Sequence, residues 1–148
     1  MSMNIQQHVR LLTQSYCALL GRPIIDGVDV PSVQQVCNAD FALVSHGTED
    51  DPLFNFGNDL ALTLFERSFE DFVQLPSRKS SGQTRDEDRI RLLDEVTRNG
   101  FIENYSGVRV SASGRKFEIS NAVVWNVVDE HEVYRGQAAK ISTWRYLD

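Results

Sequence analysis

The carboxy-terminal third of the chain, from Phe101 onward, carries the pattern that most limits the fold. Apolar and polar residues alternate there in three successive stretches, separated by turn residues at Ser113-Gly114 and at 129–132. Alternation with a period of two is typical of strands that bury one face. Because no helical segment separates the three stretches, the strands are expected to form an antiparallel meander with short connections.

The middle stretch is the longest, and its alternation predicts that five apolar side chains share one face of the strand. These are Phe117, Ile119, Val123, Trp125 and Val127. Asn121 has the same parity, although a buried amide without partners costs about 1–3 kcal/mol. Two interpretations remain open: a strand irregularity turns Asn121 outward, or the amide lies in a pocket and binds a small molecule.

The amino-terminal segment, residues 3–21, is predicted to be an amphipathic helix. Its apolar stripe recurs at steps of four and three residues and consists of Ile5, Val9, Leu12, Tyr16 and Leu19. Each large side chain favours burial by about 1.5–3 kcal/mol. The stripe can lie against the chain's own sheet or pair with the same helix of a second copy. We expect the second arrangement, a two-fold symmetric homodimer, because this is the commonest assembly of soluble proteins.

The segments between this helix and the meander predict a connector at 22–40, strands at 41–46 and 53–56, and then helices. Asn58 and Ser68 suit the N-cap positions of two short helices.

A capping box formed by Thr84 and Glu87 then predicts a longer helix, which ends at Gly100. The order of helix, strands, helices and strands predicts an α+β fold with the helices on one face of an antiparallel sheet.

Length and charge place this fold in one domain over residues 1–148 and limit its partners. The 15 basic and 21 acidic residues give a net charge of −6, which disfavours nucleic-acid binding. Neither a membrane-spanning apolar run nor a signal sequence is apparent, so a cytoplasmic location is expected. Cys17 and Cys37 lack the spacing of a metal or redox motif and are expected to be free thiols.

Several short sequence motifs resemble those of the MEKHLA domain family, over about residues 41 to 144. They are Asn55–Glu66, Leu75–Arg78, Tyr105–Ser111, Gly114–Phe117, Val124–Asn126 and Gly136–Ala139. The family occurs alone in bacteria, the form suggested here, and at the end of plant homeodomain leucine-zipper proteins. The resemblance implies a PAS-like core at 41–146, with a five-stranded antiparallel sheet, helices inserted between strands 2 and 3, and a sensory or regulatory role.

The same motifs suggest candidate ligand-binding residues. Arg78, Tyr105 and Arg109 lie within these motifs. A guanidinium near the mouth of a pocket is suited to binding a carboxylate. Ion pairs with the many acidic residues explain the arginines equally well. Asn121 and Trp125 complete the set of candidates.

No catalytic, metal or cofactor site is predicted. The region at 72–83, where light-sensing PAS-like proteins carry a flavin-reactive cysteine, contains none, and no histidine in the inserted helices could bind haem. The scattered His8, His46 and His131 lack metal-ligand spacing. We therefore expect neither flavin nor haem, and no enzyme activity.

The leading functional hypothesis is a sensory or regulatory module that binds a small ligand or a protein partner and acts through protein association. An alternative is a purely structural oligomerisation module with a core filled by Phe41, Phe54, Phe65, Phe69, Phe72 and Trp125. A third, a small hydrolase or isomerase, would need titratable groups converging in a cavity. A cavity of about 300 Å³ or more would favour the ligand hypothesis.

Overall fold

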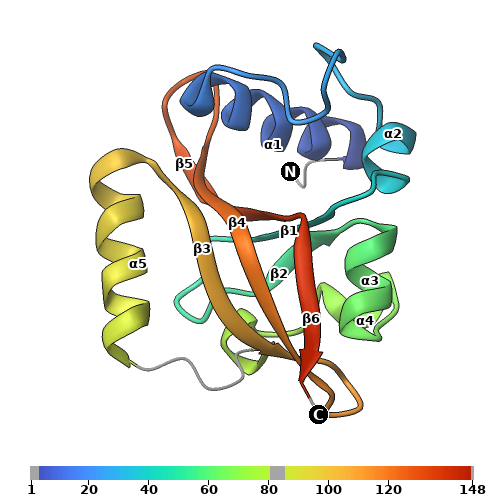
Figure 1. Ribbon diagram of the computed structural model, residues 1–148. Coiled ribbons are helices and arrows are strands. Elements are labelled where there is room, and N and C mark those ends of the chain that lie inside the picture. Colours follow the sequence, from blue (N-terminus) through green and yellow to red (C-terminus); the bar gives the residue numbers. More distant parts are fainter. Residues whose placement is uncertain (1–3, 81–85, 148) are drawn as a thin grey trace.

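The computed structural model describes residues 4–80 and 86–147 (Figure 1). The strands are β1 (Ala42–His46), β2 (Phe54–Gly57), β3 (Phe101–Val110), β4 (Lys116–Val128), β5 (Tyr134–Ile141) and β6 (Thr143–Leu147). The helices are α1 (Ile5–Leu20), α2 (Val33–Cys37), α3 (Asp59–Phe65), α4 (Phe69–Phe72), the 3-10 helix η1 (Ser77–Ser80) and α5 (Asp86–Asn99).

All strand pairs are antiparallel, and five strands follow the order β2-β1-β5-β4-β3. The predicted α+β fold and antiparallel meander are confirmed. The prediction that the helices lie on one face of the sheet is wrong, because α1 and α2 pack against the face opposite to that covered by α3 and α4. The last predicted strand corresponds to β5, which pairs with the second half of β4. A further strand that was not predicted, β6, follows Ser142 and pairs with the first half of β4, from Lys116 to Ser120. The helices α3, α4, η1 and α5 are inserted between β2 and β3, as the family resemblance implied.

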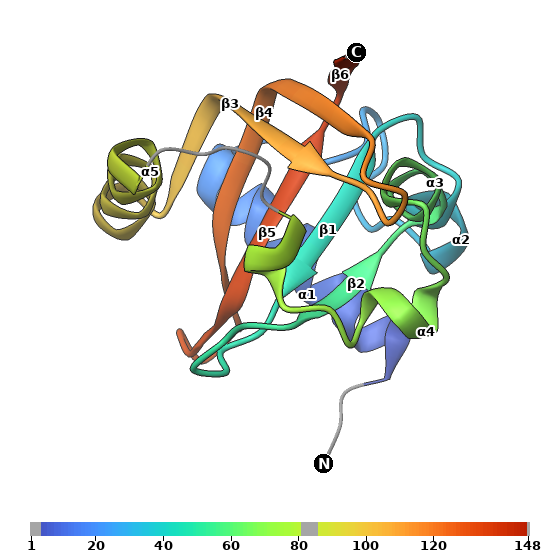
Figure 2. The same ribbon diagram turned by 90° about the horizontal axis from the view of Figure 1, so that it is seen from below.

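The sheet separates two apolar layers. Figure 2 shows α1 behind the sheet, with α4 and the 3-10 helix in front of it. The inner layer packs Phe65 and Phe72 of the inserted helices against the sheet, and the outer layer packs α1 and α2 against the opposite face. α5 lies beside the edge strand β3 (Figure 1).

The apolar stripe of α1 lies against the chain's own sheet. Val9, Leu12 and Tyr16 are at most 1% exposed and belong to the same cluster as Trp125. The prediction that this stripe forms a homodimer interface is therefore wrong, because the sheet already buries the side chains that a second copy would need. Leu19 is half-buried at the edge of the cluster, and Ile5 is 44% exposed.

The strand β4 contains a bulge at Asn121, whose φ of 55° is in the left-handed region. Tyr105 pairs with Ala122 and Gly107 pairs with Ile119, so β4 has one more residue than β3 in this interval. A one-residue insertion reverses which face the following side chains occupy.

The prediction of one shared face along β4 is therefore wrong. Phe117 and Ile119 belong to the inner layer, whereas Val123, Trp125 and Val127 belong to the outer layer. Asn121 itself is exposed, which is the outward-turned alternative that the sequence left open.

Asn58 caps α3 as predicted, and its fully buried amide also holds three segments together. Its Oδ1 accepts hydrogen bonds from the amides of Ala61 and Leu43, at 3.1 and 3.0 Å. Its Nδ2 donates to the carbonyls of Val36 and Phe41, at 3.0 and 2.8 Å. The N-cap thus fixes the end of α2 and the start of β1 relative to α3.

Other predicted boundaries agree with the structure in part. α1 ends at Gly21, with a φ of 72°, and α5 ends before Gly100, with a φ of 84°. The predicted capping box at Thr84 lies outside the described residues. Within residues 4–80 and 86–147, no helix combines the length and apolar character that crossing a bilayer requires.

Candidate ligand-binding cavity

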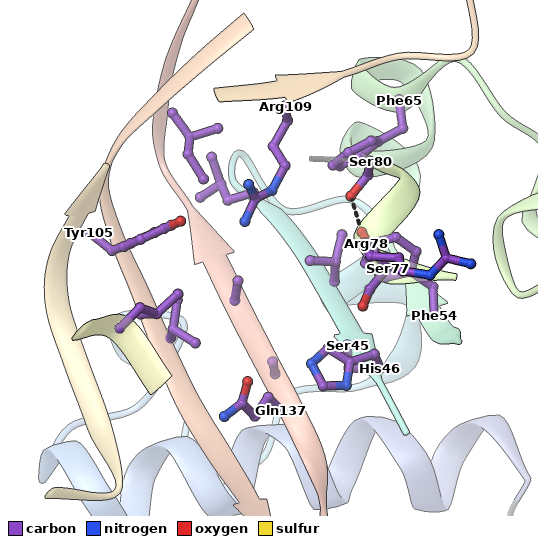
Figure 3. Close-up of a pocket in the computed structure, with 17 residues that line it drawn as sticks. Ser45, His46, Phe54, Phe65, Ser77, Arg78, Ser80, Tyr105, Arg109 and Gln137 are labelled. Carbon is purple, nitrogen blue, oxygen red and sulfur yellow. Dashed lines mark hydrogen bonds between the residues drawn. The ribbon is translucent and has the colours of Figure 1, made fainter. Parts of the chain in front are cut away.

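A cavity of about 140 Å³ lies between the inner face of the sheet and the inserted helices (Figure 3). Its lining comes from every strand of the five-stranded path and from α3, η1 and α5. The apolar part of this lining consists of Val44, Phe54, Phe65, Leu92, Ile119, Val124, Ala138, Ala139 and Ile141. We call this space the inner cavity.

A small residue in the middle of the sheet borders the inner cavity. Ala139 of β5 pairs with Val44 on one side and Val124 on the other, and all three line the cavity. The aromatic side chains of the inserted helices pack beside this space, since Phe54 stacks on Phe72 with ring centroids 4.2 Å apart. An alanine between such neighbours leaves volume that a larger side chain would fill.

Tyr105 and Arg109 supply the polar groups on the β3 side of the cavity. Together with Gly107 they occupy alternate positions of one strand, and both side chains point into the cavity in Figure 3. The Tyr105 ring extends over Gly107, where an added Cβ would lie 2.8 Å from the Tyr105 hydroxyl oxygen. The Arg109 guanidinium carbon lies 6.0 Å from the Tyr105 ring centroid, a cation–π distance.

Arg109 keeps most of its donors available. Its Nη1 donates to the carbonyl of Val108 at 3.2 Å. Among the side chains that the structure describes, no carboxylate pairs with Arg109 and no partner bonds the Tyr105 hydroxyl. A half-buried cation and a phenol therefore face a cavity whose lining is mainly apolar.

Arg78 forms an ion pair, which is one of the two roles that the sequence left open for it. Its Nε donates to both carboxylate oxygens of Asp51, at 3.0 and 3.2 Å, and its side chain is 54% exposed. In Figure 3 the guanidinium of Arg78 points away from the cavity, so only the rest of the residue contributes to the wall. The ion-pair interpretation therefore applies to Arg78.

Two further candidates do not line the cavity. Trp125 is fully buried in the outer layer beneath α1, and Asn121 is exposed on the bulge. The prediction that they contact a ligand there is contradicted, because the bulge places Trp125 on the opposite face of the sheet from Ile119, which lines the cavity. The Trp125 Nε1 is buried with no hydrogen-bond acceptor among the described residues.

Sequence reasoning missed several polar residues of the lining. The Ser80 hydroxyl donates to the Ser77 carbonyl at 2.7 Å, and the Gln137 side chain donates to Asn126 Oδ1 at 3.2 Å. His46 Nδ1 lies 3.0 Å from the Gly47 carbonyl oxygen. Gln137 lies in one of the motifs that resemble the family. The 3-10 turn that carries Ser77 and Ser80 has no periodicity by which it could be predicted. Across the described residues, no three His, Cys, Asp or Glu side chains form a grouping that could hold a metal ion.

The strand order and the inserted helices define a PAS-type fold, and solved structures of this type are similar to the chain. The PAS domain of a protein from Colwellia psychrerythraea aligns with a TM-score of 0.60 and 15% identity, over 77% of this chain and 92% of that one. The light-state dimer of the fungal blue-light photoreceptor Vivid aligns with a TM-score of 0.61 and 16% identity, over 95% and 96% of the two chains.

Within that class, the chain belongs to the MEKHLA domain family, whose domain matches residues 6–146. This match covers more of the chain than the short motifs did, since it includes α1 and the connector. The homeobox-leucine zipper protein ATHB-9 of Arabidopsis thaliana is 27% identical over 150 residues, which cover 94% of this chain. The chain spans only 17% of that relative's length.

Proposed function

We propose that this chain is a sensory or regulatory module that binds a compact small molecule in the inner cavity and acts through a protein partner. The observation that carries the proposal is the pairing of an apolar cavity with the available donors of Arg109 and Tyr105. Ligand sites typically combine an apolar lining with a few polar groups that orient the ligand. No catalytic role is part of the proposal, and the predictions about flavin, haem and enzyme activity stay predictions.

The size of the cavity limits the ligand. At about 140 Å³ it falls short of the roughly 300 Å³ that was expected to favour the ligand hypothesis, so the support for a ligand comes from the lining and not from the volume. An engineered apolar cavity of about 150 Å³ is nevertheless large enough for benzene. We therefore propose a ligand with a body of about one aromatic ring.

The filled-core alternative receives less support. Of the six aromatic residues that it requires, Phe54, Phe65 and Phe72 surround the inner layer, but Phe41 and Trp125 belong to the outer layer. Phe69 is 37% exposed. The aromatic residues therefore do not converge to fill the space between sheet and helices.

Neighbouring residues on the central strands offer a physical route from the cavity to α1. On β4, Val124 faces the cavity and Trp125 packs under α1. On β5, both Ala138 and Ala139 contribute to the cavity lining, but Ala139 packs against the inner cluster and Ala138 belongs to the outer cluster. A ligand that shifts these strands changes the packing beneath α1, because close-packed layers transmit displacement. We propose that the partner detects this change, in the cytoplasm, where the two free thiols Cys17 and Cys37 would stay reduced.

A cavity-filling variant tests the proposal. Thermal unfolding and native mass spectrometry of the whole chain are measured with toluene, phenol, benzoate and isovalerate at millimolar concentrations. At least one compact probe is expected to bind and raise the melting temperature of the native protein, because a ligand that binds only the folded state stabilises it. Ala139→Leu should fold and lose this response.

Two results would refute the proposed function. One is that no compact probe binds the native protein. The other is that a folded Ala139→Leu variant binds as tightly as the native protein does. Circular dichroism of the unliganded variant establishes folding, and Ala139→Val provides a smaller filling of the same space if leucine disrupts the sheet.

A further inference from the structure

We propose that the ligand of the inner cavity is a compact monocarboxylate, held at its carboxylate by Arg109 and Tyr105, with an apolar body against β4 and β5. This inference rests on the proposed function of the cavity. It adds the chemical class of the ligand, its orientation and the two residues that select it.

The first argument is electrostatic. Five arginines of the described chain, namely Arg22, Arg78, Arg98, Arg135 and Arg145, are each paired with a carboxylate of the protein. Arg109 faces the cavity instead, in a chain whose net charge is −6. A guanidinium in a half-buried site keeps its charge and needs an anionic partner to offset lost hydration. A ligand carboxylate supplies that partner.

The second argument is geometric. Within the part of the chain that the structure describes, the Arg109 guanidinium makes one hydrogen bond, from Nη1 to the Val108 carbonyl, and the rest of its planar fork matches a carboxylate. The Tyr105 hydroxyl provides another donor on the same side of the cavity (Figure 3). Gly107 makes this arrangement possible, since any side chain there would collide with the Tyr105 hydroxyl.

The remaining lining determines the rest of the ligand. Most of the remaining lining is formed by aliphatic and aromatic side chains, including Val124, Ile141 and Phe54. Such a wall favours an aromatic ring or a short branched chain over a polar body. A volume of about 140 Å³ fits benzoate or isovalerate in size.

The site can accommodate a ligand with one negative charge. Arg78, the other arginine of the lining, pairs with Asp51 and points outward. Among the described side chains, Arg109 is the one arginine of the lining without a carboxylate partner, so a dicarboxylate or a phosphate dianion would bury a second negative charge without a matching arginine, which is strongly unfavourable in a mainly apolar cavity.

Matched pairs of charged and neutral probes test this inference. Binding of benzoate and benzamide to the whole chain is measured by ligand-observed NMR and calorimetry. The native protein is expected to prefer benzoate by about tenfold or more, since hydrogen bonds to charged groups contribute about 1.5–3 kcal/mol. Arg109→Gln should remove this preference, and Tyr105→Phe should reduce it. Arg78→Gln is the control, and it should leave the preference unchanged.

The possible outcomes separate the two levels of the proposal. Equal binding of benzoate and benzamide by the native protein would overturn the carboxylate inference and leave the cavity as a small-molecule site. Failure of both probes, and of toluene and phenol, would refute the proposed function as well. A preference that persists in folded Arg109→Gln and Tyr105→Phe variants, or that is lost in Arg78→Gln, would overturn the assignment of the selecting residues.

Discussion

The indole ring of Trp125 meets the phenol ring of Tyr16 edge to face, with ring centroids 4.9 Å apart and an interplanar angle of 76°. Trp125 is in the centre of the sheet and Tyr16 is near the end of α1, so this contact joins the two. Ser15, the preceding residue, adds polar contacts: its hydroxyl donates to the Asn126 carbonyl at 2.9 Å and accepts from the Val128 amide at 3.0 Å. The helix is therefore part of the folded core.

Removing an apolar side chain from the stripe of α1 should destabilise the chain itself. Leu12 is fully buried, and Leu12→Ala is expected to lower the free energy of unfolding by about 2–5 kcal/mol. Ile5 is 44% exposed, so Ile5→Ala should change it by less than about 1 kcal/mol. Urea denaturation measures both. A Leu12→Ala variant of native stability would show that α1 is not integral to the core.

The N-cap residues Asn58 and Ser68 should contribute differently to the free energy of unfolding. Ser68 caps α4 through one exposed bond to the Asp71 amide, and Ser68→Ala should cost about 1 kcal/mol. Asn58→Ala leaves several buried backbone groups without partners and should cost about 3 kcal/mol or more. Equal losses in denaturant titrations would contradict the role of Asn58 as a hydrogen-bonding centre.

Gly136 should tolerate no side chain. Its φ is 131°, and an added Cβ would lie 2.0 Å from the His46 carbonyl oxygen on the paired strand β1. Gly136→Ala is expected to destabilise the protein by at least about 3 kcal/mol or to prevent folding. Gly114 also has positive φ, at 87°, but space surrounds it, so Gly114→Ala should cost about 1 kcal/mol. Comparable melting temperatures for the two variants would count against this difference.

His8 should make the chain less stable in mild acid. Its ring is near Ser45, with Nε2 3.1 Å from the serine hydroxyl oxygen, and burial lowers the pKa of His8 from its ordinary value of 6.5. The folded state therefore binds a proton less readily than the unfolded state does. The stability contribution is fully present above pH about 6.5 and declines as the pH falls towards the folded-state pKa.

The measurement compares unfolding free energies at pH 7.5 and pH 5.0. His8→Gln should reduce the difference between the two values. His131→Gln, at a side chain that is 77% exposed, serves as the control and should leave the difference unchanged. An unaltered pH dependence in His8→Gln would exclude His8 as its source.

The sequence predicts element types well because local signals specify them. The caps at Asn58 and Ser68 and the glycine stop after α1 are each encoded by one or two residues. The bulge at Asn121 is different, because an asparagine in an alternating stretch is equally compatible with a regular strand and with a left-handed residue. The wrong face assignment of Trp125 follows directly from that ambiguity.

For the candidate site, too, the sequence predicts some features and leaves others open. Tyr105 and Arg109 each lie two positions from Gly107, one before it and one after it, so a regular alternation brings them to one face. The partner of Arg78, Asp51, lies 27 residues away, and no spacing rule reveals such an ion pair. The orientation of an arginine depends on tertiary neighbours, and for that reason the sequence alone could not separate Arg78 from Arg109.

The bulge also has a consequence for how this family can diverge. Because β4 consists of two half-strands of opposite phase, a relative that loses the extra residue must rotate one half by 180° and exchange its buried and exposed side chains. Insertions and deletions at this point are therefore tolerated only with a compensating change, as in β3, where Asn104, with a φ of 60°, restores the register. The two asparagine positions should evolve as a pair, and the segments before and after Asn121 as separate blocks.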